Sequence, residues 1–328
     1  MQLPLLRLCP NRKQFYCFRV VRKYRPNVNS VCDLLQEIIL LSLYCSIILL
    51  LVYPVMSSKL FPCANTPDVF LIDTHCHLDM LSYPQETSKI LSEAMKCGIG
   101  QVVSIGIDYA SSCIAAKLAA GYNNVFATIG IHPHAAESAT ERELQKLASL
   151  AKDATLGKKV VAFGEIGLDY VKKYASKNAQ QDAFERQLDL AKKLELPVII
   201  HDRDAHEDTL RLLRSHGPFP RGGVMHCFSG DIAFAEKIID LGFFLSIPGV
   251  VTFTKATVLQ EVVCTIDLKN LLLETDSPFL APSPFRGRPN QPAYMLYTAK
   301  KVAELKKISL QEVAQKTSAN AAALFRLE

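Results

Sequence analysis

Short apolar runs rich in β-branched residues recur along this chain from about residue 68 onward, and each ends at polar residues. Runs of about four to seven residues with flanking Gly or Pro and no helical period are typical of strands buried on both faces of a parallel sheet. Eight such runs begin at or lie around Val69, Val102–Ile107, Val125, Val160, Pro197, Gly223, Phe243–Ile247 and Leu271.

Segments with apolar residues at helical spacing lie between these runs. Examples are Ile90–Met95, Leu144–Leu150, Phe184–Leu194 and Thr209–Leu213. A strand that alternates with a helix eight times over about 260 residues predicts an α/β fold, the (β/α)8 TIM barrel. We therefore expect one barrel domain over residues 68–328.

Six of the eight histidines stand at the ends of the apolar runs, and two runs end at a carboxylate. These residues are His75, His77, His132, His134, His201, His226, Glu165 and Asp276. Polar residues that follow the strands of a TIM barrel share its C-terminal rim, where such barrels keep their chemistry. Positions spread over two hundred residues are therefore predicted to meet in one pocket.

His75 and His77 are two residues apart, so an extended chain turns both imidazoles to the same side and lets them grip one ion. Asp276 ends the last run and is expected beside the first strand, because a barrel closes on itself. Asp276 can then ligate the same ion and take the proton from an attacking water.

Glu165 ends a buried run, where an unpaired carboxylate would be costly. A carboxylate can lend one oxygen to each of two ions, so Glu165 is the candidate bridge in a two-metal site, with His201 and His226 on the second ion. Mixed imidazole and carboxylate ligation suits Zn, Mn, Fe or Co, whereas Mg prefers oxygen. We expect two divalent metal ions and leave their identity open.

The net charge of +5 is unevenly divided. Residues 1–59 hold eight Lys and Arg against Asp33 and Glu37, which leaves 29 basic against 30 acidic residues in the remainder, a net charge of −1. This near-neutral body shows no broad basic face for long-range capture of DNA, although a local patch can hide within it. Modest, salt-sensitive binding to few phosphates is expected.

Residues 1–60 form an N-terminal extension outside the predicted barrel. Residues 38–56 carry no charge and follow a basic region, which suits a membrane anchor. The alternative is that translation begins at Met56 and the preceding residues are upstream sequence. If residues 38–56 are an anchor, the protein is bound to a membrane through this segment alone. If translation begins at Met56, the protein is expected in the cytoplasm.

Ten cysteines are scattered without a CxxC motif, so neither a zinc knuckle nor a thioredoxin-like pair is indicated. Buried free thiols in a reducing compartment are the plain interpretation, which favours the cytoplasm. Cys76 and Cys227 adjoin histidines, and strand alternation is expected to turn them away from the pocket.

Six ordered motifs resemble the TatD family of metal-dependent deoxyribonucleases, within the amidohydrolase superfamily. They are Thr74-His-Cys-His-Leu-Asp79, Gly130-Ile-His-Pro-His134, Gly164-Glu-Ile-Gly-Leu-Asp169, Ile200-His-Asp-Arg203, His226-Cys-Phe-Ser-Gly230 and Glu274-Thr-Asp-Ser-Pro278. The resemblance covers residues 69–327. It implies a TIM barrel that hydrolyses phosphodiester bonds in DNA, often as a 3′-to-5′ exonuclease.

Carried over by motif, one ion has the ligands His75, His77, Glu165 and Asp276, and the other has Glu165, His201 and His226. His132 matches the family position that helps to hold the phosphate or ease the leaving group.

On the rim, His134, Arg203 and Ser229 are candidate phosphate contacts, or else solvated residues or groups that orient the histidines. Glu274 lies on the same side of its strand as Asp276 and is a candidate orienting residue.

The competing interpretation is a metal-dependent amidohydrolase that cleaves a C–N or ester bond in a small molecule. Many of those enzymes bridge their metals with a modified lysine after the fourth strand, whereas this chain has Glu165 there. A barrel that binds nucleic acid or protein without catalysis is the third class, and the intact ligand set argues against it. The expected partner is a DNA substrate, and no stable protein partner is implied.

Overall fold

The computed structural model describes residues 69–81 and 86–327, which belong to a unit spanning Cys63–Glu328. Eight parallel strands form one sheet in the order β1 to β8. The strands are β1 Leu71–Cys76, β2 Ile99–Ser104, β3 Val125–Ile129, β4 Val160–Asp169, β5 Val198–Arg203, β6 Gly223–Met225, β7 Phe243–Ile247 and β8 Leu271–Leu273.

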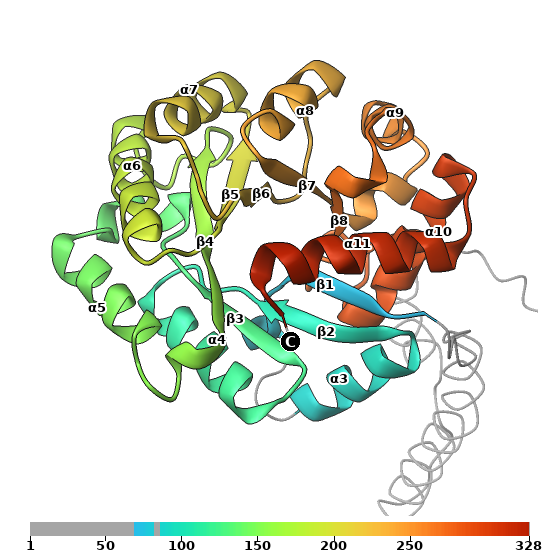
Figure 1. The fold of residues 1–328 in the computed structure, drawn as a ribbon, viewed down its shortest axis with the longest axis horizontal. Helices are drawn as coiled ribbons and strands as arrows, with labels where there is room; N and C mark the ends of the chain where they lie inside the picture. Colours follow the sequence, from blue (N-terminus) through green and yellow to red (C-terminus); the bar gives the residue numbers. More distant parts are fainter. Residues whose placement is uncertain (1–68, 82–85, 328) are drawn as a thin grey trace, which may run out of the picture. The chain divides into compact units, whose positions relative to one another are not determined.

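Helices alternate with these strands and surround them (Figure 1). They are α3 Thr87–Lys96, α4 Tyr109–Gly121, α5 Glu141–Ala151, α6 Lys177–Lys193, α7 His206–His216, α8 Ile232–Ile239, α9 Thr257–Thr265, α10 Met295–Lys306 and α11 Leu310–Phe325. A short 3-10 helix, η2 Pro133–Ser138, follows β3. The predicted TIM barrel is confirmed.

The barrel closes where the first strand meets the chain that leaves the last one. The Asp276 amide donates to the His75 carbonyl at 2.8 Å, and the His77 amide donates to the Ser277 carbonyl at 2.8 Å. A parallel bridge pairs Cys76 with Ser277. These contacts hold Asp276 beside His75 and His77.

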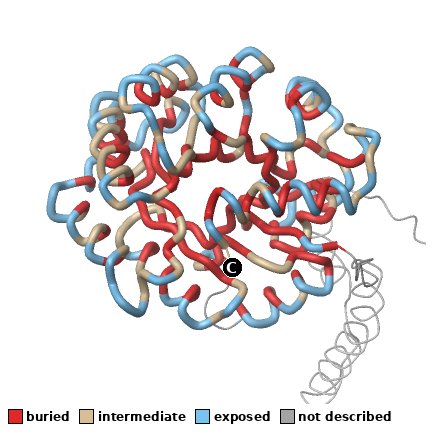
Figure 2. Tube along the Cα trace, in the orientation of Figure 1, coloured by how far each residue is buried: buried red, intermediate tan, exposed pale blue. Residues whose placement is uncertain are grey.

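The strands are buried along most of their length, whereas the outer sides of the helices are exposed (Figure 2). Alternating strand residues build two apolar layers. One side of each strand packs against the helices, as Leu71, Val102 and Val125 do. The other side fills the barrel interior, which contains Ile72, Val103, Phe126, Ala162, Ile199, Val224 and Leu272. This alternation is the pattern expected of a closed sheet wrapped by helices.

Helix α11 covers the N-terminal end of the barrel and so leaves the opposite end for chemistry. Its Ser318 hydroxyl donates to the Phe70 carbonyl, and the Asn320 amide donates to the carbonyls of Leu268 and Leu271, all at the starts of strands. Phe325 of α11 is buried with the interior layer.

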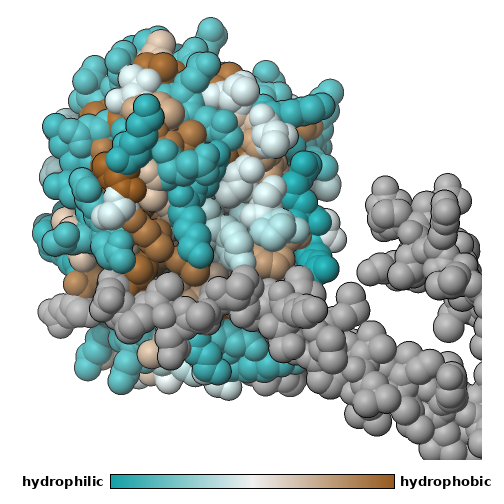
Figure 3. All heavy atoms as spheres, turned by 90° about the vertical axis from the view of Figure 1, so that its right-hand side faces the viewer, coloured by the Kyte–Doolittle hydropathy of each residue, from teal (hydrophilic) through white to brown (hydrophobic). Residues whose placement is uncertain are grey.

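The outer helix faces are polar, as the sequence periodicity predicts. Hydrophilic side chains cover most of the face drawn in Figure 3, and apolar ones gather in smaller patches between them. Side chains also cap the N-termini of helices: Asp108 caps α4, Ser176 caps α6 and Ser309 caps α11. These caps satisfy backbone amides that have no partner within the helix.

Strand β4 is longer than the apolar run that predicts it. The run ends at Glu165, but pairing with β5 continues from Gly167 opposite His201 to Asp169 opposite Arg203. Gly167 has φ of +140°, and a Cβ there would collide with the His201 carbonyl oxygen. Glycine therefore permits the close approach of the two backbones that carry Glu165 and His201.

Cys76, Cys113, Cys227 and Cys264 are free thiols, as predicted, but only Cys76 of these four is fully buried, and Cys264 is exposed. The prediction is wrong for Cys97, which is disulfide-bonded. Within residues 69–81 and 86–327 no helix is long and apolar enough to cross a bilayer. The predicted anchor at 38–56 and the candidate start at Met56 lie outside the described residues.

Candidate metal centre

Glu165 lies at the centre of a buried cluster, and its two carboxylate oxygens face different histidines. Oε2 is 3.4 Å from His75 Nε2 and 3.9 Å from His77 Nε2. Oε1 is 2.6 Å from His201 Nδ1 and 3.5 Å from His226 Nε2. Among the described residues, every ion-pair partner of Glu165 is a histidine, and no lysine pairs with it.

The first donor set joins β1 to the loop after β8. Asp276 Oδ1 lies 3.4 Å from His77 Nε2 and 3.8 Å from His75 Nε2. These three side chains offer ligand atoms within 4.8 Å of one another. The closure of the barrel produces this proximity, because it fixes Asp276 against the His75 backbone.

The second donor set comes from β4, β5 and the segments that follow β3 and β6. Ligand atoms of His132, Glu165 and His201 lie within 4.8 Å of one another. His226 stacks on His75 with ring centroids 3.5 Å apart. The structure thus brings all six predicted metal ligands into one cluster at the end of the barrel opposite α11.

A cation suits this cluster, because several of its buried nitrogen atoms make no hydrogen bond within the part of the chain that the structure describes. Among these residues, neither ring nitrogen of His75 has a hydrogen-bond partner, nor does Nδ1 of His77. Burial, helped by the neighbouring His226, lowers the pKa of His75 to about 3, so its imidazole is neutral and keeps a lone pair. Neutral imidazoles beside two carboxylates are a donor set for a divalent ion that accepts nitrogen and oxygen.

The charges within the cluster are complementary. Burial opposes ionisation of Glu165, but hydrogen bonds from His132 and His201, together with the charge of His226, outweigh it and hold the pKa of Glu165 well below the usual range. Burial also opposes protonation of His201, but hydrogen bonds to Asp169 and Glu165 raise its pKa to about 9. A bound cation would take the place of these protons.

His226 is oriented by Glu274. Glu274 Oε1 lies 3.0 Å from His226 Nδ1 and accepts from the Cys227 amide at 2.8 Å. Burial opposes the charged imidazole, but Glu274 and Glu165 raise the pKa of His226 to about 10. Glu274 therefore lies where it can orient a histidine, as expected, and that histidine is His226.

Asp169 is a site residue that the sequence reasoning missed. Its buried carboxylate receives His134 Nε2 at 2.7 Å and the amides of Val171 and Lys172, and it lies 3.5 Å from His201 Nε2. Asp169 ends the motif that contains Glu165 and lies an even number of residues after it. On an extended strand this spacing turns both side chains to the same side, and it could have identified Asp169 from the sequence.

Asp73 is a second missed residue, and it braces the first strand. It accepts from the amide and the hydroxyl of Thr275 at 2.9 and 2.6 Å, and from the His75 amide at 3.3 Å. Burial raises the pKa of Asp73 to about 7. These bonds link the backbones that carry His75 and Asp276.

His132 presents one nitrogen to its own loop and the other to the cluster. Its Nδ1 accepts from the His134 amide at 3.1 Å, which places the proton of the neutral ring on Nε2. That Nε2 lies 3.5 Å from Glu165 Oε1. Burial lowers the pKa of His132, so the ring stays neutral and offers an N–H donor.

The predicted phosphate contacts lie on the same rim. His134 is one-third exposed, and Arg203, half exposed, has its Nη1 4.0 Å from Asp169 Oδ2. Ser229 is exposed in the loop between β6 and α8. His134 and Arg203 thus share a carboxylate, and their contact with phosphate stays a prediction.

Cys227 corrects one expectation. Its sulfur lies within 4.8 Å of ligand atoms of His226 and Asp276, so the side chain is not turned away from the pocket. Strand alternation does not apply, because β6 ends at Met225 and Cys227 has φ of +46°. Burial raises the pKa of the thiol well above its usual value and keeps it protonated.

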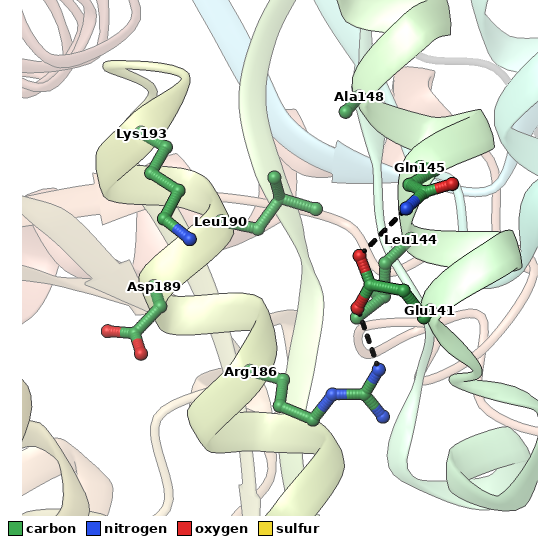
Figure 4. A pocket seen from close by; sticks show the side chains of 8 residues that line it. All are labelled: Glu141, Leu144, Gln145, Ala148, Arg186, Asp189, Leu190 and Lys193. Atoms are coloured by element: carbon green, nitrogen blue, oxygen red, sulfur yellow. Dashed lines mark hydrogen bonds and ion pairs between the residues drawn. The ribbon is translucent and has the colours of Figure 1, made fainter.

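A separate groove on the outer wall, between α5 and α6, carries no such chemistry (Figure 4). Its residues are Glu141, Leu144, Gln145, Ala148, Arg186, Asp189, Leu190 and Lys193. Glu141 pairs with Arg186 at 3.3 Å and accepts from Gln145 at 3.0 Å. Glu141 and Arg186 are thus satisfied within the wall.

Comparison with known proteins shows that the barrel and its donor cluster are those of a metal-dependent hydrolase. A family model described as TatD related DNase matches residues 72–326, and the chain belongs to the TatD family. It is 40% identical over 257 residues to YabD, an uncharacterized metal-dependent hydrolase of Bacillus subtilis, covering 78% of this chain and 99% of that protein.

Two relatives from Escherichia coli agree. YcfH, an uncharacterized metal-dependent hydrolase, is 37% identical over 263 residues, covering 79% of this chain and 97% of that protein. The crystal structure of the TatD homologue YjjV matches with a TM-score of 0.75 at 32% identity, covering 79% of this chain and 98% of that chain. The predicted family and metal-dependent hydrolase class are confirmed.

Proposed function

We propose that this protein is a two-metal deoxyribonuclease that cleaves phosphodiester bonds of DNA. The observation that carries the proposal is the position of Glu165, whose oxygens face two separate donor sets. A bridging carboxylate of this kind holds two ions about 3.5–4 Å apart, the spacing used by phosphatases and nucleases.

In this proposal His75, His77 and Asp276 would hold one ion together with Glu165, and His201 and His226 the other. When bound, such a pair supplies positive charge beside the phosphate and makes water acidic enough to attack near neutral pH. Asp276 is largely buried yet reaches the rim, so it can accept the proton of the attacking water.

His132 would act on the substrate through its Nε2 proton. The backbone amide of His134 fixes that proton on the inner nitrogen. A neutral N–H donor beside the phosphate would stabilise the charge that develops on a phosphoryl or leaving oxygen. His134 and Arg203 would bind phosphate from the rim. The 3′-to-5′ direction of cleavage is carried over from the family resemblance.

The test is nucleotide release from 3′-labelled single-stranded DNA by the full chain, with Mg or Mn added and with EDTA. Glu165→Gln keeps the shape of the side chain and removes the charge that bridges two ions. We expect two ions per chain by elemental analysis, and a loss of most activity in this variant. Glu207→Gln, at an exposed residue of α7, is the matched control and should retain activity.

Two results would contradict the proposal. DNA cleavage that survives both EDTA and Glu165→Gln would place the activity elsewhere. Metal binding without phosphodiester cleavage, together with hydrolysis of a small amide or ester, would establish the amidohydrolase alternative.

A further inference from the structure

A basic pocket of about 420 Å³ lies beside the candidate metal centre, between the end of β4 and the start of α6. We call it the Tyr174 pocket. The residues that line it include Asp169, Glu137, Lys172, Lys173, Tyr174 and Lys177. The pocket and the centre share Asp169, whose carboxylate contacts His134 and His201 on the other side.

Positive charge predominates in the Tyr174 pocket. Lys172, Lys173 and Lys177 are exposed and lie within six residues of one another. The Asp169 carboxylate is already engaged by His134 and by two backbone amides, which leaves Glu137 as the opposing charge. The N-terminus of α6, a 17-residue helix, adds a partial positive charge at the same place. The pocket is thus a local basic patch on a near-neutral body.

Tyr174 brings an aromatic face to this patch. Its side chain is 67% exposed, more than any other large hydrophobic residue in the part of the chain that the structure describes. The ring meets His134 edge-on, with centroids 4.9 Å apart. Aromatic side chains that stay exposed next to lysines are the platforms on which bases of single-stranded nucleic acids stack.

Resting on the proposed function, we propose that the Tyr174 pocket binds the nucleotide next to the scissile phosphodiester. Its base stacks on Tyr174, and its phosphate pairs with Lys172 and Lys173. Lys177 lies 3.9 Å over the Tyr170 ring and shapes the wall of the pocket.

The experiment compares two substrates with the full chain and added Mn. One is a single-stranded DNA 8-mer, and the other is methyl p-nitrophenyl phosphate, a phosphodiester without a nucleotide. Tyr174→Ala should raise KM for the 8-mer about tenfold, since stacking on one base is worth roughly that factor, and leave kcat within about twofold. Tyr174→Phe keeps the aromatic face and should behave as the wild type.

The lysines are tested by salt dependence. In Lys172→Ala/Lys173→Ala the slope of log Kd for the 8-mer against log salt should fall by about 0.7, because the contact with one phosphate is lost. Lys300→Ala/Lys316→Ala removes two exposed lysines of α10 and α11 and is the matched control. Neither lysine pair should change kcat/KM for the small diester by more than about twofold.

The outcomes separate this inference from the proposed function. If the small diester is hydrolysed and the Tyr174 and lysine variants leave the 8-mer unchanged, the pocket is not a nucleotide site although the nuclease proposal stands. If the wild type hydrolyses neither substrate, fluorescence anisotropy of a labelled 8-mer decides: weaker binding by Tyr174→Ala supports the pocket, and equal binding overturns it.

Discussion

Glu274 and His226 form a buried pair in which Glu274 Oε1 lies 3.0 Å from His226 Nδ1, while the opposite ring nitrogen, Nε2, faces Glu165 at 3.5 Å. A carboxylate behind a histidine fixes its tautomer and strengthens the outer nitrogen as a ligand. Glu274, which directly follows β8, therefore supports the second donor set through His226.

Glu274→Gln should weaken metal binding about 10- to 100-fold while the protein stays folded, because the amide cannot hold the proton on His226 Nδ1 as strongly as a carboxylate does. Metal titration monitored by calorimetry measures the change, and Glu207→Gln is the control. Unchanged affinity would show that His226 does not depend on this carboxylate for its orientation.

His132→Gln should retain two ions per chain and lose about 10²- to 10³-fold in kcat, the usual effect of removing one donor to a developing oxyanion. The reason is that the ring nitrogen facing the cluster carries the proton. Elemental analysis and steady-state kinetics on single-stranded DNA check both parts. Loss of one ion in the variant would instead identify His132 as a ligand.

Gly167→Ala should destabilise the fold by about 1–3 kcal/mol and reduce metal affinity, since the added Cβ meets the His201 carbonyl at φ of +140°. Gly121→Ala is the control, because a Cβ at the end of α4 meets nothing within 4 Å. Urea unfolding of both variants gives the comparison. Equal free energies of unfolding for the two variants would show that β4 and β5 can move apart to accept the added Cβ without destabilising the fold.

His206 should make stability depend on pH. Its Nδ1 lies 2.8 Å from Asp202 Oδ2, and its ring stacks on Phe234. The Asp202 hydrogen bond raises the pKa of His206 above 6.5, helped by the nearby charges of Asp204 and Asp231. A raised folded-state pKa stabilises fully below the unfolded value, and that contribution is lost as the pH rises through the folded value.

Urea unfolding at pH 5.5 and pH 8.5 tests this dependence. Because the His206 ring is about one-third exposed, solvent screening reduces its contribution, and His206→Gln should lose about 0.5 kcal/mol more at pH 5.5 than at pH 8.5. A difference that is constant over this range would exclude titration of His206 as its source.

Much of the fold could be predicted because strand burial and helix amphipathicity are local patterns. The run before His201 predicts β5, which is Val198–Arg203, and the run Gly223–Met225 matches β6 without change. The boundaries of β4 and β1 could not be predicted from hydrophobicity, because both strands continue through polar residues, such as Asp169 and His75, whose pairing depends on a neighbouring strand.

The sequence by itself determined which side chains gather at the rim, since a parallel barrel turns the residues that follow its strands toward one end. Only the tertiary structure decided which atom faces which. The Nδ1 of His226 meets Glu274 from a strand two positions along the barrel, and Cys227 enters the cluster because its left-handed backbone departs from strand geometry. Such contacts join residues far apart in sequence, so no local periodicity contains them.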